Sequence, residues 1–111
     1  TTHLVYAVQN HCESNGFGVV REFVGHGIGR DMHEAPEVPN YGKKGHGYKL
    51  VEGDTICIEP MITLGSPDIG ILEDDWTIVT QDGLPAAHYE HTVLVTKDGN
   101  VPLTVPPLST Q

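Results

Sequence analysis

Residues 25–36, with the sequence GHGIGRDMHEAP, decide how this chain is interpreted. Glycine occupies three alternate positions, one before His26 and two after it. Glycines at alternate positions remove side chains from one face of an extended segment and let other groups come close to the backbone. The stretch therefore predicts a strand on which the imidazole of His26 has bare neighbours. A second histidine, His33, follows seven residues later.

Two carboxylates farther along the chain are candidate partners for His26. Glu59 follows the apolar run TICI at 55–58, and Glu90 precedes the run HTVLV at 91–95. A carboxylate inside or beside a buried strand is costly unless it is paired. One histidine and two glutamates from separate strands make a ligand set for zinc or for a harder divalent metal. We therefore expect a metal centre at these three residues.

Each of these residues also has a simpler interpretation. His26 could be a packed core histidine, Glu59 could pair with an arginine, and Glu90 could accept hydrogen bonds from Thr or Tyr neighbours. The flanking glycines argue against packing for His26, and the chain has only two arginines, so the three residues together favour a metal. Cys12 and Cys57 stand in no basic or glycine-flanked setting that would activate a nucleophile, and Cys57 receives no role.

The length and net charge of the chain limit the classes of function that it can have. The chain has 111 residues and a formal net charge of −9, which indicate one small domain. The acidic balance argues against nucleic acid and against anionic membranes as partners. Two cysteines are too few for a disulfide scaffold and are typical of thiols in a reducing compartment. With no apolar run long enough to cross a membrane and no signal-peptide pattern, we expect a cytoplasmic location.

The residue pattern predicts an α+β fold, in which one N-terminal helix is followed by a mainly antiparallel sheet. The helix is expected at 3–14 and is ended by Asn15-Gly16. Strands are expected at 17–24, 55–64, 76–80 and 89–96, with a long functional loop at 33–48. Asp98-Gly99 predicts a tight hairpin into residues 101–105.

Four groups of motifs, taken together, make the chain recognisable. They are GHGIG with MHEAP at 25–36, IEPM at 58–61, DWT at 75–77 and YEHT at 89–92. In this order, and collinear from the first helix to about residue 104, they resemble type I methionine aminopeptidase. The resemblance implies the C-terminal half of a pita-bread fold. Residues 1–105 would be that half of the catalytic domain, and residues 106–111 a loose tail.

The resemblance also implies roles for single residues. His26, Glu59 and Glu90 match ligands of a dinuclear metal site that binds Co, Mn, Fe or Zn, with Glu90 bridging the two ions. Glu59 matches a ligand that also transfers protons, and His33 matches the histidine that contacts the scissile amide. The remaining matches, Met32 and Trp76, line one side of the methionine pocket, although Trp76 read on its own is most simply a core residue.

One departure from the family pattern limits what the chain can do alone. The two other ligands of the family are aspartates of an N-terminal half that this sequence does not match, and the chain opens on Thr1 and not on methionine. We therefore expect at most one weak metal site and no activity from the isolated chain. Its partners would be the N-terminal methionine of peptides or nascent proteins, and the missing half or a homodimer in its place. The alternatives are a non-catalytic binding module and a proline-linked aminopeptidase.

Overall fold

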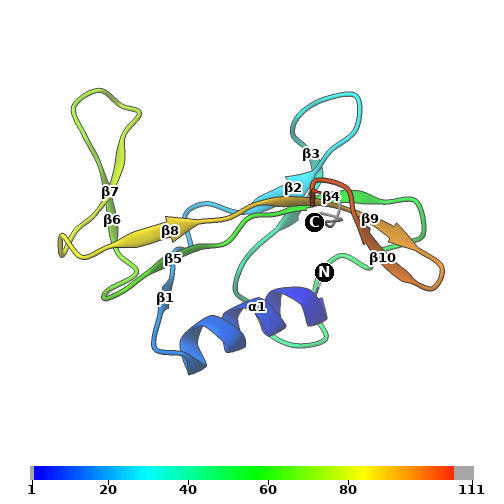
Figure 1. The fold of residues 1–111 in the computed structure, drawn as a ribbon, viewed down its shortest axis with the longest axis horizontal. Coiled ribbons are helices and arrows are strands. Elements are labelled where there is room, and N and C mark those ends of the chain that lie inside the picture. Colours follow the sequence, from blue (N-terminus) through cyan, green and yellow to red (C-terminus); the bar gives the residue numbers. More distant parts are fainter. Residues whose placement is uncertain (1, 107–111) are drawn as a thin grey trace, which may run out of the picture.

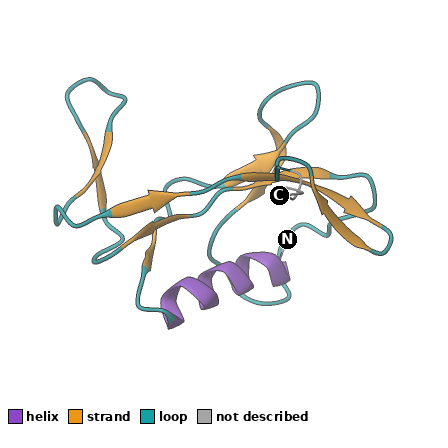
Figure 2. Cartoon of the chain, viewed as in Figure 1, coloured by secondary structure: helices purple, strands orange, loops and turns teal. Residues whose placement is uncertain are grey.

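The computed structural model describes residues 2–106 and confirms the α+β arrangement of one helix followed by antiparallel strands (Figures 1 and 2). The elements are α1 (Thr2–Ser14), β1 (Gly18–Val19), β2 (Gly25–Gly27), β3 (Glu34–Val38), β4 (Thr55–Ile58), β5 (Met61–Thr63), β6 (Ile69–Ile71), β7 (Ile78–Thr80), β8 (Ala86–His88), β9 (His91–Thr96) and β10 (Gly99–Pro102). In this part of the chain, no helix has the length and apolar character needed to cross a membrane.

The strands form two sheets and a separate hairpin. The larger sheet has the order β10-β9-β4-β2-β3, the smaller one β1-β5-β8, and β6 pairs only with β7. In Figure 1, β4 runs on into β5 and β8 into β9, so that one long, bent ribbon links the two sheets. Helix α1 lies below this ribbon, while the β2–β3 connection and the β6–β7 hairpin project on the opposite side.

The core lies between α1 and the larger sheet. Val38, Ile56 and Val93 form a buried cluster, against which Leu4 of α1 and Ile58 of β4 pack. Because successive residues of a strand point to opposite faces, Ile56 and Ile58 face the helix and the residues between and after them face away from it. The expected alternation in this strand is therefore confirmed, and it leaves the face opposite α1 for polar groups.

Several predicted element boundaries were wrong. The strand expected at 55–64 is two strands, because Pro60 has no N–H to continue the ladder. The strand expected at 89–96 begins only at His91, and β8 precedes it. Of the strand expected at 17–24, only β1 pairs with a neighbour, and the loop expected at 33–48 contains β3 at the edge of the larger sheet.

The ends of the chain agree better with expectation. Helix α1 stops where Asn15-Gly16 was expected to stop it, and Gly16 has a φ of 85°, which favours glycine. The predicted hairpin joins β9 to β10, but its two-residue turn lies at 97–98, and Gly99, with a positive φ of 146°, is the first residue of β10. The strand expected at 76–80 begins at Ile78 and pairs with β6, which was missed. The loose tail expected at 106–111 lies outside the described residues except for its first position.

The glycines around His26 have a packing role as well. A Cβ added to Gly25 would lie 2.1 Å from the carbonyl oxygen of Cys57, and one added to Gly27 would lie 2.2 Å from that of Ala35. Strand β2 is therefore held between β3 and β4 at a separation that no larger residue permits. The same two glycines that bare the imidazole also let its strand enter the sheet.

We expect Gly25→Ala to lower the free energy of unfolding by at least about 1 kcal/mol, because overpacking forces the backbone of β4 away. Urea denaturation followed by circular dichroism measures this change. Gly70→Ala is the matched control, since a Cβ there meets no atom within 4 Å, and its effect should stay within about 0.5 kcal/mol. Equal effects of the two substitutions would contradict the packing role.

Candidate metal centre

The register of the long ribbon sets two carboxylates opposite each other. Glu59 directly follows β4, and Glu90 directly precedes β9. Ile58 pairs with His91 in the antiparallel ladder, so the next position along the ribbon sets Glu59 opposite Glu90. The β5–β8 ladder continues in the same register beyond them. Like charges directly opposite on adjacent strands are destabilising, and a bound cation would remove this cost.

His26 supplies the third donor from the neighbouring strand. Its Nε2 lies 2.9 Å from Oε1 of Glu59, and its Nδ1 lies 2.9 Å from the carbonyl oxygen of Gly27. Because a carbonyl can only accept, the hydrogen-bond network assigns the proton to Nδ1, and Nε2 is the atom that faces the carboxylates. A backbone carbonyl that fixes the tautomer in this way is typical of metal-binding histidines. The donor set therefore fits a divalent cation.

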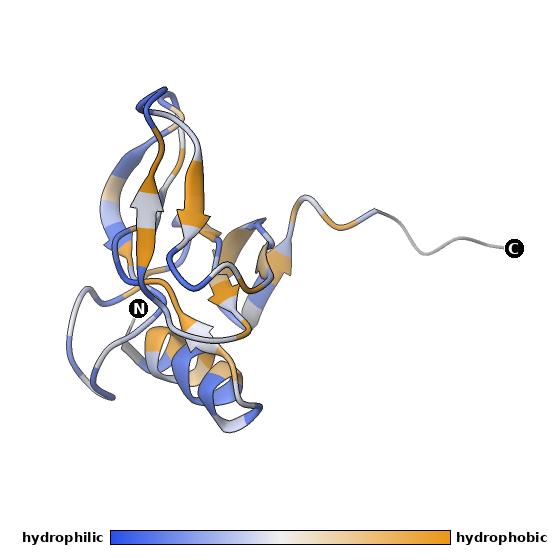
Figure 3. Ribbon diagram, turned by 90° about the vertical axis from the view of Figure 1, so that its left-hand side faces the viewer, coloured by the Kyte–Doolittle hydropathy of each residue, from blue (hydrophilic) through white to orange (hydrophobic). Residues whose placement is uncertain are grey.

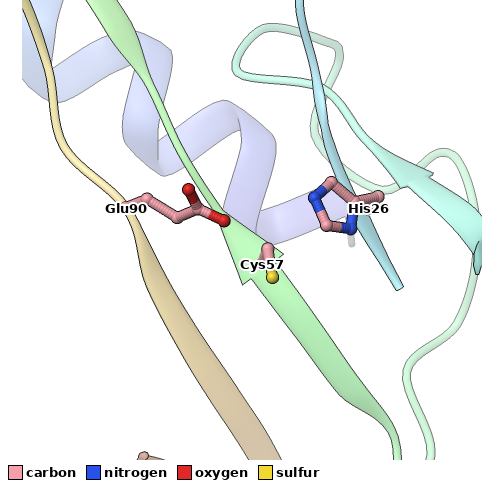
Figure 4. Close-up of side chains that lie close together, drawn as sticks. All are labelled: His26, Cys57 and Glu90. Atoms are coloured by element: carbon pink, nitrogen blue, oxygen red, sulfur yellow. The ribbon is translucent and has the colours of Figure 1, made fainter. Parts of the chain in front are cut away.

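Two three-donor groups meet at this point of the sheet. One consists of His26, Cys57 and Glu90, and the other of Glu59, His88 and Glu90; within each group the donor atoms lie within 4.8 Å of one another. Figure 4 shows the first group, whose side chains come from three adjacent stretches of chain. All three residues expected to be ligands are thus brought together. Glu90 belongs to both groups, as a bridging carboxylate would.

Sequence reasoning missed His88 and Cys57. Nε2 of His88 lies 3.3 Å from Oε2 of Glu59, so each oxygen of that carboxylate faces an imidazole. Both missed residues precede an expected ligand by two positions, His88 before Glu90 and Cys57 before Glu59. Since residues two apart in a strand share a face, this spacing is the signal that could have found them.

The residues expected to bind substrate lie on the projecting connections. The ring of His33 stands 4.3 Å from that of His26, edge to face at 61°, and both histidines line an open hollow of about 450 Å³. Met32 is 71% exposed in the same connection, between β2 and β3. Figure 1 shows this connection and the β6–β7 hairpin rising on the same side of the bent ribbon, opposite α1. By strand alternation, Cys57 and Glu59 face this side.

The expectation that Trp76 is a core residue was wrong. Trp76 is 86% exposed, between β6 and β7. These two strands pair only with each other and project from the sheet, so no second layer of the described chain covers their connection. The alternative taken from the resemblance, that Trp76 lines a pocket for substrate, is compatible with this exposure.

Cys57 is the buried member of the centre. Its side chain is 1% exposed, and its Sγ lies 3.4 Å from Oγ1 of Thr92. Burial raises the pKa of the Cys57 thiol, and a smaller contribution in the same direction comes from Glu90. A thiol with a raised pKa stays protonated at neutral pH and is a poor nucleophile when no metal is bound.

The comparisons with known proteins agree with this geometry. The sequence model of metallopeptidase family M24 matches residues 1–97. The chain belongs to this family. Among its relatives, a methionine aminopeptidase of Clostridium acetobutylicum is 52% identical over 104 residues, which are 94% of this chain and 42% of the relative. Methionine aminopeptidase 1 of Bacillus subtilis is 45% identical over 88% of this chain and 40% of its own length.

Solved structures give the same result for the fold of this M24 member. The crystal structure of methionine aminopeptidase from Thermotoga maritima matches 92% of this chain with a TM-score of 0.89 and 47% identity. That from Rickettsia prowazekii matches 91% with a TM-score of 0.88 and 43% identity. In both, the match covers 41% of the solved chain. The chain therefore has part of the pita-bread fold and spans about two fifths of the length of its relatives.

The opposed carboxylates lead to a prediction about stability without metal. In the presence of a chelator, we expect Glu90→Gln to raise the free energy of unfolding by about 0.2–1 kcal/mol, because it removes one of two facing charges. With a divalent metal added, wild type should become more stable than Glu90→Gln, because a bound ligand stabilises only the protein that binds it.

Thermal unfolding of both proteins, with chelator and with metal, measures the two effects. Glu52→Gln, which changes the net charge equally at an exposed turn before β4, is the control. A Glu90→Gln variant that is less stable than wild type in chelator would show that the two carboxylates do not repel each other.

Proposed function

We propose that residues 1–105 are the C-terminal half of the catalytic domain of a metal-dependent aminopeptidase that removes N-terminal methionine from peptides and nascent proteins. The observation that carries this proposal is the convergence of His26, Glu59 and Glu90 at the bend of the long ribbon. The similarity to methionine aminopeptidases supports N-terminal methionine as the substrate of this proposal. We place this activity in the cytoplasm, where nascent chains are made; two free cysteines fit a reducing compartment.

In this proposal His26, Glu59 and Glu90 hold the cation, and the set suits Co, Mn, Fe or Zn. A bound divalent metal supplies activation of water and polarisation of the peptide carbonyl. Glu59 also accepts and passes on a proton, and the contact of its Oε2 with His88 holds that oxygen in place. His33, on the exposed β2–β3 connection beside His26, donates a hydrogen bond to the scissile amide.

Substrate recognition in this proposal uses the two projecting connections. Met32 and Trp76 expose apolar side chains on these two connections, which project on the side of the ribbon opposite α1, and they would contact one side of the methionine side chain. An exposed apolar residue on a short connection makes few packing contacts that would fix its position. We infer that the rest of the pocket must come from outside the described residues.

We further propose that the missing N-terminal half is the chief partner of this chain. Ile71, Ile78 and Val79 are exposed on the β6–β7 hairpin, where Figure 3 shows hydrophobic strands below a hydrophilic tip. An open hollow of about 200 Å³, lined partly by this hairpin, is bordered largely by apolar residues and by His88. Exposed apolar surface of this kind is typical of a site that is buried against a partner. In the absence of the other half a second copy of this chain would be that partner, which sedimentation analysis would detect as a dimer.

Complementation tests the proposal. The 111-residue chain alone should not hydrolyse Met-Ala peptides even with metal, because the two aspartate ligands of the family pattern and most of the pocket are not in this chain; positioning alone contributes about 7–11 kcal/mol to catalysis. Mixing it with the matching N-terminal half should restore turnover, and Glu90→Gln should abolish that turnover while Glu52→Gln should not.

A peptide panel run on the same mixture distinguishes the alternatives. Cleavage of X-Pro but not of Met-Ala peptides would indicate a proline-linked aminopeptidase. A mixture that binds no metal and cleaves neither would indicate a binding module. Robust, chelator-sensitive Met-Ala hydrolysis by the chain alone would falsify the view that it forms half of a site.

His33 should contribute to turnover and not to metal binding. In the reconstituted mixture we expect His33→Ala to lower kcat/KM by about 10²–10⁴-fold, the usual contribution of a positioned proton-transfer or hydrogen-bonding group. Metal content, measured by atomic emission, should be unchanged. His11→Ala, on the exposed face of α1, is the matched control for loss of an imidazole. A His33→Ala protein with reduced metal content would instead make His33 a ligand.

A further inference from the structure

We propose that Cys57 is itself a metal ligand, so that Cys57, His26 and Glu90 form a thiolate–imidazole–carboxylate site that prefers Zn(II) and Co(II) to Mn(II). The inference rests on the proposed function in taking His26 and Glu90 as ligands. It adds a donor that the glycine, glutamate and histidine motifs of the sequence do not contain.

The sheet register places the thiol at the centre of the group. Cys57 is the ladder partner of His26 on one side and of Thr92 on the other. It shares a face with Glu59, two positions along the same strand, and this face points away from α1. Its Sγ and the donor atoms of His26 and Glu90 lie within 4.8 Å of one another. In Figure 4 the sulfur lies between the imidazole and the carboxylate.

The surroundings of the sulfur suit a metal-bound thiolate. The side chain is 1% exposed, so a free thiolate there would be an uncompensated buried charge. A divalent cation supplies the missing opposite charge. On binding, the S–H bond breaks, a metal–sulfur bond forms and the proton goes to the solvent. The hydroxyl of Thr92, 3.4 Å from Sγ, can then donate a hydrogen bond to the coordinated sulfur, as an outer partner that orients a ligand.

Other uses of this thiol fit the structure less well. A disulfide is excluded in the described fold, because Cys57 and Cys12 are both free, and Cys12 lies on α1, on the other side of the sheet. A nucleophile would need access from solvent, which a 1% exposed side chain lacks. A buried thiol that only fills space needs no imidazole and carboxylate beside it. Soft thiolate favours Zn(II) and Co(II), whereas Mn(II) prefers oxygen ligands.

Cobalt absorption spectroscopy on the 111-residue chain tests the assignment. A thiolate bound to Co(II) gives a near-ultraviolet charge-transfer band that oxygen and nitrogen ligands do not give. Because the chain has two cysteines, Cys12→Ser leaves Cys57 as the only thiol and is the matched control. We expect wild type and Cys12→Ser to show the band, saturating at one Co(II) per chain. Cys57→Ser should bind Co(II) at least about tenfold more weakly, without the band, and its preference for Co(II) over Mn(II) should fall.

The outcomes separate this inference from the proposed function. Co(II) bound by Cys12→Ser without a charge-transfer band overturns the ligand role of Cys57 and leaves the His26 and glutamate site intact. This result does not depend on whether Cys57→Ser folds. Failure of every variant, wild type included, to bind Co(II) would overturn both the inference and the proposed metal site. A band that persists in Cys57→Ser and disappears in Cys12→Ser would move the thiolate to α1.

Discussion

The opposition of Glu59 and Glu90 is the constraint on which the rest of the centre depends. Two strands run without a change of register through the bend between the sheets, so the carboxylates have no freedom to move apart along the chain. The fold thus holds two like charges face to face at the one place where Pro60 interrupts the hydrogen-bond ladder. Such an arrangement stabilises nothing by itself. It becomes favourable when a cation lies between the two groups.

The strands that carry Glu59 and Glu90 are packed against a core on one face only, the face toward α1. Gly25 lets β2 approach β4 closely enough for His26 to contact Glu59, and Gly27 lets β2 approach β3. The core of Val38, Ile56 and Val93 packs β3, β4 and β9 against α1. The donors therefore sit on short strands whose other face is packed. The connections that would bind substrate are not packed against a core in the described part of the chain, as the exposure of Met32 and Trp76 shows.

The difference between packed strands and exposed connections also explains which features could be predicted from the sequence. The α+β order, the helix, the final hairpin and the meeting of His26, Glu59 and Glu90 could be predicted, because period-two alternation and glycine spacing are local signals. Strand ends could not, since pairing partners decide them: β3 and β6 become strands only because neighbours are in reach. The two-residue spacing of His88 from Glu90 and of Cys57 from Glu59 places both missed residues on the ligand face. It does not show which residues of other strands they meet, because that depends on the register between strands. Trp76 was wrongly expected in the core. The sequence around it does not show that no other part of the described chain packs over the β6–β7 hairpin.

In the proposed function, metal binding and substrate binding accordingly depend on different parts of this chain. The donor groups lie on the sheet, within the strands that the described core stabilises, and their spacing is set by backbone pairing. The residues proposed to bind substrate, Met32 and Trp76, are exposed on their connections, and we infer that another chain segment would complete their arrangement. Under the proposed function, a chain that spans about two fifths of the length of its relatives would therefore keep the metal donors without a complete substrate pocket. For the proposed function this implies an order of assembly: folding of this half would arrange the metal donors, and the methionine pocket would form only when the two proposed halves meet.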